Sequence, residues 1–475
     1  MTRRMKSDGT RQRIKYVVSD FVAANVAWLL VNLARYHVLG RFIFDTLESF
    51  LTSANVVMGQ VLVPLFWLII YYYSGYYNQT AIKSRLVELK STIASVFYGS
   101  VIIFFVVVIN DLPKHYVSYY KLAAVLLLVQ FTLTYLPRAT ITAIQAGKLH
   151  DRRKGYATII LGCGSNARKT QEGLDTMAIS MGYDIRGFID MGDCAPSVEQ
   201  ERILERSQDI GRIISTLGID RIIIAPERLE AADISAYLNH IYKYNLPTSL
   251  AADNEYIMTH NIKLSTIYAY PLVDINKDNM PEGQKNVKQT LDFIVSAVTL
   301  VLLSPLFLFL AVKVKMDSRG PVFYKQERLG KNGRPFTMFK FRTMYTDSEQ
   351  DGPRLTTNGD GRITPFGKTM RKYRLDELPQ FWNVLKGDMS IVGPRPERRY
   401  FAEQILATAP YYYQIYTVKP GITSWGMVKF GYANDLKQMI DRLQFDIIYL
   451  DNRSLLVDMK ILIYTVKTII TGKGI

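Results

Sequence analysis

The stretch LDFIVSAVTLVLLSPLFLFLAV, from Leu291 to Val312, decides where the second half of this chain lies. It is about long enough to cross the ~30 Å hydrocarbon core of a bilayer. Both of its flanks are basic: Lys285 and Lys288 precede it, and Lys313, Lys315, Arg319, Lys325 and Arg328 follow it. A single crossing would place one basic flank outside, against the positive-inside rule.

A Ser304-Pro305 pair interrupts this stretch just past its middle. Proline removes a backbone donor and clashes with the preceding turn, so a helix kinks or breaks there. We therefore predict a re-entrant membrane helix over residues 288–313 that enters and leaves on the cytoplasmic face. The alternative is a proline-kinked true span followed by an external C-terminal domain.

Four further apolar segments, near 16–38, 51–73, 91–110 and 116–136, predict a four-helix transmembrane bundle over residues 1–140. Loops rich in Lys and Arg alternate with loops that carry few, so both ends of the bundle are expected in the cytoplasm. Asp20, near the start of the first span, is either a functional polar site or a solvated residue at the membrane boundary.

The fold class expected for the whole chain is a membrane protein of the α+β type, and its composition agrees with a membrane protein. The 475 residues carry a net charge of +16 beside 48% hydrophobic residues, which favours anionic lipid or phosphate ligands over nucleic acid. Length predicts two to four units. Cys163 and Cys194 are the two cysteines, so no disulfide framework is expected. The basic N-terminus lacks a small-residue cleavage site, which predicts a retained anchor rather than a signal peptide.

Residues 141–280 are expected to form a Rossmann-like cytoplasmic domain. Strands are predicted at Tyr156–Leu161, Tyr183–Asp190 and Asp220–Ala225, and helices near 199–217 and 230–244. The turn Gly162-x-Gly164-x-x-Ala167 could hold a dinucleotide pyrophosphate, with Asp190 on a ribose. This fingerprint is short and Asp190 comes late, so a cofactor-free regulatory or dimerisation domain is an equal alternative.

Residues 281–475 carry the densest motifs. Pro321–Arg328 and Phe339–Met344 read as two strands of a hairpin with projecting cations, either a solvated basic surface or a hairpin that faces substrate or the membrane interface. The run Leu455–Ile470 is expected to be an amphipathic helix in the membrane interface or, alternatively, a buried packing helix.

The acidic pair Asp376-Glu377 lies in LDELPQ, residues 375–380. Cations crowd the same region: Arg362, Lys368, Arg371, Lys372, Arg374, Lys386 and Arg395. Such a setting suits chemistry on a phosphate, since cations bind phosphoryl oxygens while one carboxylate attacks phosphorus and the other holds a divalent metal. An ordinary capping turn is the competing interpretation.

The chain from about 285 to 475 resembles the bacterial sugar transferase family, the monotopic phosphoglycosyl transferases. The matching pieces are FKFRTM (339–344), LDELPQ (375–380), NVLKGDMS (383–390), VGPRP (392–396) and KPGIT (419–423). The layout of four spans, a nucleotide-fold domain and a catalytic unit is similar to the large undecaprenyl-phosphate hexose-1-phosphate transferases, also described as exopolysaccharide polyprenyl glycosylphosphotransferases.

The resemblance implies that Asp376 attacks the β-phosphate of a UDP-sugar, that UMP leaves, and that undecaprenyl phosphate then takes the sugar phosphate. It implies that Glu377 helps to hold Mg²⁺, that Arg371 holds a phosphate, and that Pro394, Arg395 and Pro396 help to seat the nucleotide. We count Lys340, Arg342 and Arg362 with the substrate-binding residues. The family's Ser-Pro break matches Ser304 and Pro305. Its basic pair matches in part, because Gln289 follows Lys288 where arginine is usual, with Asp292 in place.

These expectations describe a multi-pass protein of the bacterial inner membrane with a cytoplasmic catalytic domain. It would catalyse the first membrane step of exopolysaccharide, capsule or O-antigen synthesis, with membrane lipid as a partner and a possible homodimer. Two alternatives stay open: a membrane-bound nucleotide-sugar dehydratase or epimerase that uses the Gly162–Ala167 turn, and a nucleotide-sensing scaffold. No residue decides which sugar is transferred.

Overall fold

The computed structural model describes residues 3–38, 45–78, 85–108, 116–150, 155–177, 180–206, 210–244, 246–252, 271–275, 278–346, 348, 352, 354, 360–431 and 433–471. The chain forms two compact units. The first holds Met1–Ala157, Gly173–Asp184 and Pro281–Asn286, and the second holds Thr158–Glu172, Ile185–Met280 and Val287–Ile475.

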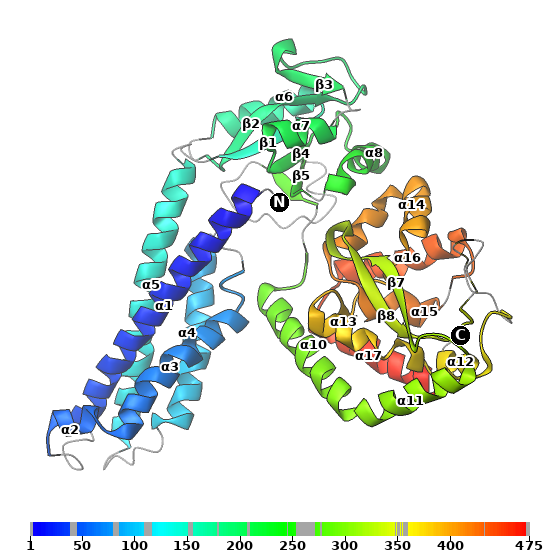
Figure 1. Cartoon of the computed structure of the whole chain (residues 1–475). Coiled ribbons are helices and arrows are strands. Elements are labelled where there is room, and N and C mark those ends of the chain that lie inside the picture. Colours follow the sequence, from blue (N-terminus) through cyan, green and yellow to red (C-terminus); the bar gives the residue numbers. More distant parts are fainter. Residues whose placement is uncertain are drawn as a thin grey trace. The chain divides into compact units, whose positions relative to one another are not determined.

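Four long helices make up most of the first unit: α1 (Arg3–Val38), α3 (Ala54–Tyr73), α4 (Arg85–Val106) and α5 (Val117–His150), with the short α2 (Leu47–Leu51) between α1 and α3 (Figure 1). Each contains a segment long and apolar enough to cross a membrane: Gly9–Val38, Ala54–Tyr73, Arg85–Val106 and Val117–Gly147. The four predicted spans are therefore confirmed as apolar helices, and the fourth continues beyond its predicted end at residue 136.

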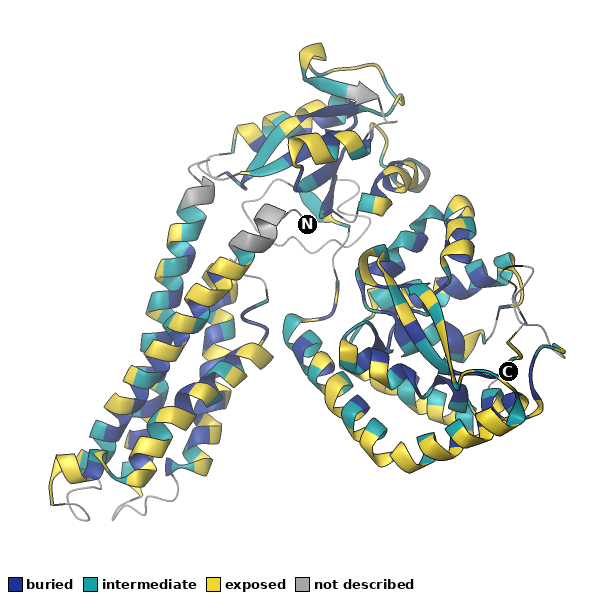
Figure 2. Ribbon diagram, in the orientation of Figure 1, coloured by how far each residue is buried: buried dark blue, intermediate teal, exposed yellow. Residues whose placement is uncertain are grey.

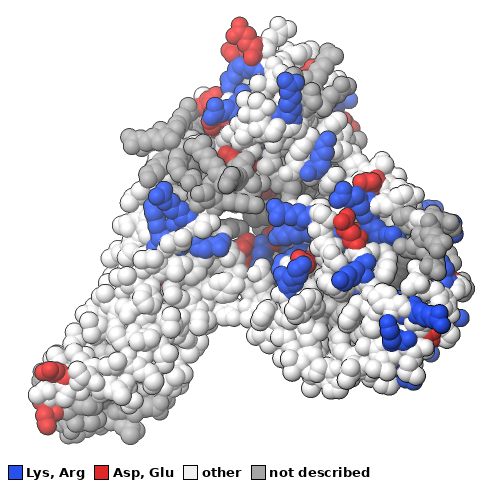
Figure 3. All heavy atoms as spheres, in the orientation of Figure 1, with Lys and Arg blue, Asp and Glu red and all other residues white. Residues whose placement is uncertain are grey.

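The outer faces of these helices expose apolar side chains, among them Val61, Leu65 and Phe105 (Figure 2). The visible face of the bundle is largely uncharged along its length, with acidic side chains at the end that carries α2 and basic ones at the other end (Figure 3). An apolar belt with charges at its ends is the pattern of a membrane-spanning bundle.

Asp20 is fully buried inside this bundle, so the expectation of a solvated boundary residue is wrong. Its carboxylate accepts hydrogen bonds from Arg138 of α5 at 2.8 and 2.6 Å and from the Tyr77 hydroxyl at 2.8 Å. Arg138 is also fully buried and donates to Thr92 of α4 at 3.1 Å. A charge in a low-dielectric interior needs such partners, and this cluster supplies them from three helices.

The sheet domain has six strands in the order β3-β2-β1-β4-β5-β6. They are β1 (Tyr156–Leu161), β2 (Tyr183–Asp190), β3 (Ile203–Arg206), β4 (Arg221–Ile224), β5 (Thr248–Ala251) and β6 (Leu272–Asp274), with helices α6 (Ser165–Asp175), α7 (Ile210–Leu217) and α8 (Ala231–Ile241) and the 3₁₀ turns Gln200–Arg202 and Tyr242–Tyr244. The pairs β1–β4, β2–β3 and β4–β5 are parallel, and β6 is antiparallel to β5.

The predicted strands at 156–161, 183–190 and 220–225 are confirmed, but the helix predicted near 199–217 is wrong in its first half. Residues 203–206 form β3, and the helix α7 begins at Ile210. A four-residue strand at the end of a sheet has too few side chains to show a period of two, and its Ile203-Leu204 pair also fits a helix.

The fifth apolar run forms two helices, α10 (Glu282–Leu302) and α11 (Ser304–Asp317), which meet at a bend of 63°. Leu303 alone separates them. Pro305 lies in the first turn of α11, where its missing N–H costs nothing, and the Ser304 hydroxyl donates to the Val301 carbonyl at 2.8 Å. The predicted helix break is confirmed.

The remaining elements belong to the region that carries the acidic pair. They are β7 (Phe323–Leu329), the turn η6 (Lys331–Gly333), β8 (Pro335–Phe341), α12 (Pro365–Lys372), η7 (Leu375–Glu377), α13 (Gln380–Lys386), β9 (Ser390–Val392), α14 (Arg399–Thr408), η8 (Pro410–Thr417), β10 (Gly421–Thr423), α15 (Trp425–Lys429), α16 (Leu436–Asp451) and α17 (Leu455–Ile470). The antiparallel β7–β8 hairpin confirms the predicted one, although β8 begins at Pro335 rather than Phe339.

Two apolar clusters hold this region together. Leu310 and Val314 of α11 pack with Phe341 of β8 and Met370 of α12. A second cluster joins α14, η8 and α16. The helix α17 buries Ile461 but exposes apolar side chains on its other face: Leu456, Met459, Ile463 and Ile470. That exposed face favours the interfacial interpretation of α17 over the buried one.

Candidate active site

The acidic pair lies on η7, a short turn between α12 and α13. Arg374 precedes it with a φ of 53°, a left-handed conformation that is strained for a residue with a side chain. Such strain costs on the order of 1–3 kcal/mol and is concentrated at functional sites. Asp376 is 8% exposed and Glu377 is 4% exposed, so both carboxyl groups are almost enclosed.

Three cations surround Glu377. The Lys340 Nζ lies 2.8 Å from Oε1, the Arg395 Nη1 lies 3.7 Å from Oε1, and the Arg374 Nη1 lies 3.5 Å from Oε2. Burial by itself raises the pKa of the Glu377 carboxyl, but the charges of Lys340, Arg395 and Arg374 outweigh burial and hold that pKa below its usual range. Glu377 is therefore ionised at neutral pH.

Asp376 has a different environment. Burial raises the pKa of its carboxyl above the usual range, the positive charge of Lys340 opposes this, and the adjacent charge of Glu377 adds to it. Within the part of the chain that the structure describes, the Asp376 carboxylate accepts no hydrogen bond. Its oxygens are thus available to a substrate, while those of Glu377 are committed to cations.

Of the predicted cations, the structure brings Lys340, Arg371, Arg374 and Arg395 to the acidic pair. Arg371 donates to the Thr343 hydroxyl at 2.9 Å, and its charge acts on Asp376. Arg362 forms a bidentate pair with Asp360, with a shortest distance of 2.6 Å, which lowers the pKa of that carboxyl to about 2. Arg371 therefore lies with the acidic pair, whereas Arg362 is occupied by its own carboxylate partner.

Arg342 points to the end of α11. Its guanidinium donates to the carbonyl oxygens of Val314 at 3.3 Å, Ser318 at 2.7 Å and Arg319 at 3.0 Å. Carbonyls at a helix C-terminus lack partners within the helix, so these contacts cap α11. Among the described residues Arg342 makes no hydrogen bond or ion pair with Asp376 or Glu377, so its contacts do not support the predicted substrate-binding role.

The loop Gly393–Pro396 leaves β9 and brings Arg395 to Glu377. β9 pairs in parallel with β10, and the Gly421 amide donates to the Pro394 carbonyl at 2.9 Å. A Cβ atom at Gly421 would collide with the Gly393 nitrogen, so this close approach requires glycine. The motifs VGPRP and KPGIT are therefore neighbours because two short strands pair.

Several residues that hold this site were not predicted as site residues: Arg374, Glu397 and Arg442. Arg374 stands next to the pair, and that adjacency was the available signal. Glu397 accepts from Arg442 at 2.6 Å across 45 residues of sequence. No local pattern indicates that contact.

The glycine turn of the sheet domain is closed by a carboxylate of the protein. Glu227 accepts from the Ser165 hydroxyl at 2.6 Å and from the Asn166 amide at 3.4 Å. A Cβ atom at Gly164 would collide with a Glu227 oxygen. Asp190 accepts from the Cys163 thiol at 3.4 Å and from the Gly192 amide at 2.8 Å. Glu227 therefore occupies the start of α6 and accepts the backbone N–H of Asn166 there. The predicted pyrophosphate would need this same N–H at the helix N-terminus.

The start of α10 contacts the C-terminal helix. The Lys288 Nζ lies 2.6 Å from an Asp458 oxygen of α17, and Asp292 accepts from the Ser390 hydroxyl at 2.6 Å. Lys288, which lacks the usual arginine neighbour, thus has a buried acidic partner.

A magnesium ion fits this site only together with its substrate. No group of three or more His, Cys, Asp or Glu side chains that could hold a metal occurs among the described residues. Mg²⁺ is commonly bound by one or two carboxylates with substrate phosphates and water completing its shell. Glu377, the predicted ligand, can supply one such carboxylate, although an ion on Glu377 must share its oxygens with Lys340, Arg374 and Arg395.

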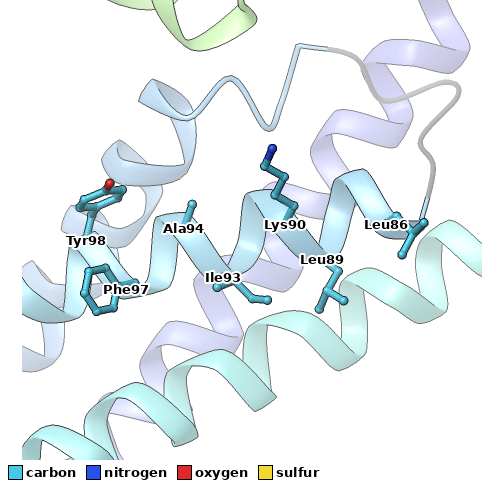
Figure 4. Close-up of a pocket in the computed structure, with 7 residues that line it drawn as sticks. All are labelled: Leu86, Leu89, Lys90, Ile93, Ala94, Phe97 and Tyr98. Atoms are coloured by element: carbon cyan, nitrogen blue, oxygen red, sulfur yellow. The ribbon is translucent and has the colours of Figure 1, made fainter. Parts of the chain in front are cut away.

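A hollow of about 480 Å³ lies elsewhere, on one face of α4 (Figure 4). Its lining consists of Leu86, Leu89, Lys90, Ile93, Ala94, Phe97 and Tyr98. The opposite face of α4 is buried and carries Glu88, Thr92 and Val96. This hollow is on the apolar outer surface of a candidate span and is unrelated to the acidic pair.

The fold and the site define a membrane protein with a sheet domain and an enclosed carboxylate pair among cations. The bacterial sugar transferase family matches residues 283–472. A relative from Caulobacter vibrioides, named UDP-glucose:undecaprenyl-phosphate glucose-1-phosphate transferase, is 38% identical over 39% of this chain and 70% of its own length. The chain belongs to the bacterial sugar transferase family.

Two other relatives show how far the similarity extends. The UDP-N-acetylgalactosamine-undecaprenyl-phosphate N-acetylgalactosaminephosphotransferase of Aeromonas hydrophila is 45% identical over 40% of this chain and 44% of the relative. The undecaprenyl-phosphate galactose phosphotransferase of Salmonella typhimurium is 28% identical over 94% of this chain and 95% of the relative. The chain spans less than two thirds of several of the relatives it matches at higher identity.

Proposed function

We propose that this protein transfers a sugar 1-phosphate from a UDP-sugar to undecaprenyl phosphate and releases UMP. The observation that carries the proposal is the contrast within the acidic pair: Glu377 is held ionised by three cations, while Asp376 accepts no hydrogen bond from the described residues. The relatives named above act on undecaprenyl phosphate. This step would initiate exopolysaccharide, capsule or O-antigen synthesis.

The reaction proceeds in two displacements at one phosphorus atom. An Asp376 oxygen bonds to the β-phosphorus, the bond from that phosphorus to the bridging oxygen breaks, and the electron pair leaves with UMP. A phosphate oxygen of undecaprenyl phosphate then bonds to the same phosphorus, and the Asp376 carboxylate is restored. Lys340, Arg371 and Arg395 lie where they can bind phosphoryl oxygens and stabilise the developing charge.

Glu377, with Asp376 beside it, would hold Mg²⁺ against the donor diphosphate. When bound, the ion supplies Lewis-acid polarisation of phosphoryl oxygens and charge neutralisation of the leaving UMP. The cations around Glu377 fix the orientation of its carboxylate before the donor arrives.

The proposal also covers the α10–α11 pair, the helix α17 and the sheet domain. The bent pair α10–α11 would be a re-entrant helix that holds the catalytic region at the cytoplasmic face of the bacterial inner membrane, with α17 in the interface. The strand order β3-β2-β1-β4-β5 supports the prediction of a Rossmann-like domain. Because Glu227 fills its glycine turn, we assign this domain a structural or dimerisation role rather than a redox one.

UMP release by purified protein tests this function. The full chain in detergent or nanodiscs, given undecaprenyl phosphate, Mg²⁺ and a panel of UDP-sugars, is expected to release UMP with one or a few donors. Asp376→Asn should reduce release by at least about 10³-fold, as expected when a nucleophile is lost. EDTA should stop release, and Mg²⁺ should restore it.

Cys163→Ser is the matched control, because Cys163 lies in the sheet domain and should leave UMP release unchanged. A phosphosugar adduct on Asp376, trapped with donor alone and found by intact mass, would establish the covalent step. Full activity of Asp376→Asn would overturn it. A sugar-nucleotide conversion without lipid acceptor would favour the dehydratase or epimerase alternative.

A further inference from the structure

We propose that α16 and β7 form a clamp that aims Arg395 at the acidic pair, with Glu397 as its central positioning residue. The clamp consists of Arg328, Glu397, Arg442 and Asp446, and among the described residues none of the four forms an ion pair with Asp376 or Glu377. The inference rests on the function proposed above and deepens it by naming what orients a donor-binding cation.

Two side chains on one face of α16 lie against the loop residues that flank Pro396, namely Arg395 and Glu397. Arg442 and Asp446 are four residues apart, one helical turn. The Arg442 Nη2 donates to Glu397 Oε1 at 2.6 Å. Burial raises the pKa of the Asp446 carboxyl, and the backbone amide of Arg395 is among the groups that oppose this rise, so Asp446 lies beside the backbone of Arg395. Arg395, which faces the acidic pair, is thereby held through Glu397, two residues further along the loop, with Asp446 beside its backbone.

Arg328 of β7 closes the clamp from the other side. Its Nη1 donates to the Pro396 carbonyl at 3.1 Å and to Glu397 Oε2 at 3.3 Å. The Leu329 amide donates to the Glu397 carbonyl at 3.1 Å. Groups outside the loop therefore donate to both carboxylate oxygens of Glu397. They also donate to the carbonyl oxygens of Pro396 and Glu397.

Three of the four clamp residues are buried, and the Arg328 side chain is 12% exposed. Glu397, Arg442 and Asp446 are 5%, 6% and 4% exposed. A Cβ atom at Gly426 of α15 would lie 2.8 Å from Arg442 Cγ and 3.1 Å from an Asp446 oxygen, so glycine there lets α15 and α16 approach closely. The Gly426 amide also donates to Asp446 at 3.1 Å.

Stability alone is a weak reason for this arrangement. The cost of desolvating buried charges commonly cancels their attraction, and apolar replacements of such pairs are often neutral or stabilising. Charged hydrogen bonds also have a defined geometry, so they fix the orientation of the groups that they join. Here they fix a loop whose Arg395 Nη1 lies 3.7 Å from Glu377 Oε1.

A double-mutant cycle tests the clamp against a merely structural role. Glu397→Gln and Arg442→Met, each made in the full chain, should lower kcat/KM for the UDP-sugar about tenfold or more, mainly through KM. Arg395→Ala should do the same. If Glu397 acts through Arg395, Glu397→Gln should have almost no further effect in the Arg395→Ala background. Equal effects in both backgrounds would overturn the proposal.

Arg453→Met is the matched control. The Arg453 side chain is 10% exposed and its Nη1 lies 2.8 Å from an Asp278 oxygen, so this substitution also removes an ion pair. Among the described residues Arg453 forms no ion pair with the loop. It should leave kcat/KM within about twofold of the unchanged protein, because an ion pair away from the reacting groups contributes to folding rather than to transition-state binding.

Hydrogen–deuterium exchange tests the clamp without any substrate, because it measures how firmly the loop itself is held. Backbone amides of residues 393–399 should exchange faster in Glu397→Gln and Arg442→Met than in Arg453→Met. Unchanged exchange in both clamp variants would overturn the proposal. Failure of the unchanged protein to release UMP with any donor would instead overturn the proposed function, and the exchange result would still decide the clamp.

Discussion

Asp376 and Glu377 are adjacent in sequence but chemically distinct, and two of the three cations that distinguish them come from other elements. Lys340 is on β8, Arg395 follows β9, and Arg374 is held in a left-handed conformation beside the pair. Their positive charges lower the pKa of Glu377 against the effect of burial, while burial raises the pKa of Asp376. One carboxyl is a fixed negative charge, and the other keeps its oxygens for the substrate.

Arg342, by contrast, is a cation of the FKFRTM motif that bonds to backbone carbonyls at the end of α11 instead of to the acidic pair. We expect Arg342→Met to lower the free energy of unfolding by about 2 kcal/mol, the cost of losing charged hydrogen bonds to carbonyls at the end of α11. Unfolding in detergent measures this, and UMP release per folded molecule should change little. A large rise in KM at unchanged stability would instead support the predicted substrate-binding role.

At the scale of elements, the α10–α11 pair is the decisive feature, because a true span and a re-entrant helix would place the catalytic region on opposite sides of the membrane. The 63° bend falls at Leu303, where Pro305 begins a new helix rather than kinking an old one. A helix that ends and restarts can turn back toward the face from which it came.

Topology reporters test this element. Fusions before Met1 and after Ile475 should both report the cytoplasm if α10–α11 is re-entrant, and a periplasmic signal after Ile475 would contradict it. In Ser304→Leu/Pro305→Leu, removal of the break should allow a continuous helix and shift part of the C-terminal reporters to the periplasm. Leu302→Ala, which leaves the break intact, is the matched control.

At the scale of the whole molecule, charges are buried in the span bundle as well as in the catalytic region. Asp20 and Arg138 come from the first and last long helices of the bundle and are both fully buried, and Thr92 and Tyr77 complete their hydrogen bonds. The contact ties distant parts of the first unit together, so the bundle has one preferred packing rather than four interchangeable apolar helices.

Arg138→Met should destabilise the bundle by about 3 kcal/mol, because it leaves the buried Asp20 carboxylate without its cation. Asp20→Asn/Arg138→Met should recover part of this loss, since neither buried charge remains. Thermal unfolding in one detergent measures both variants. Additive losses in the double variant would show that the pair contributes no coupling of its own.

The sequence by itself determined what depends on neighbours along the chain. Apolar length predicted the four helices, Ser304-Pro305 predicted the break, and the segments Pro321–Arg328 and Phe339–Met344 predicted the β7–β8 hairpin. The acidic pair stood out because its cations are concentrated nearby in sequence. Short elements such as β3 were misjudged, since four residues show no clear period.

Only the tertiary structure decided which charges meet. Asp20 and Arg138 are 118 residues apart, Glu397 and Arg442 are 45 apart, and Glu227 closes a turn more than 60 residues before it. Hydrophobic periodicity and helix breaks are local properties of a chain. The partner of a buried charge is set by three-dimensional packing, because burial makes an unpaired charge costly and only packing determines which groups are within reach.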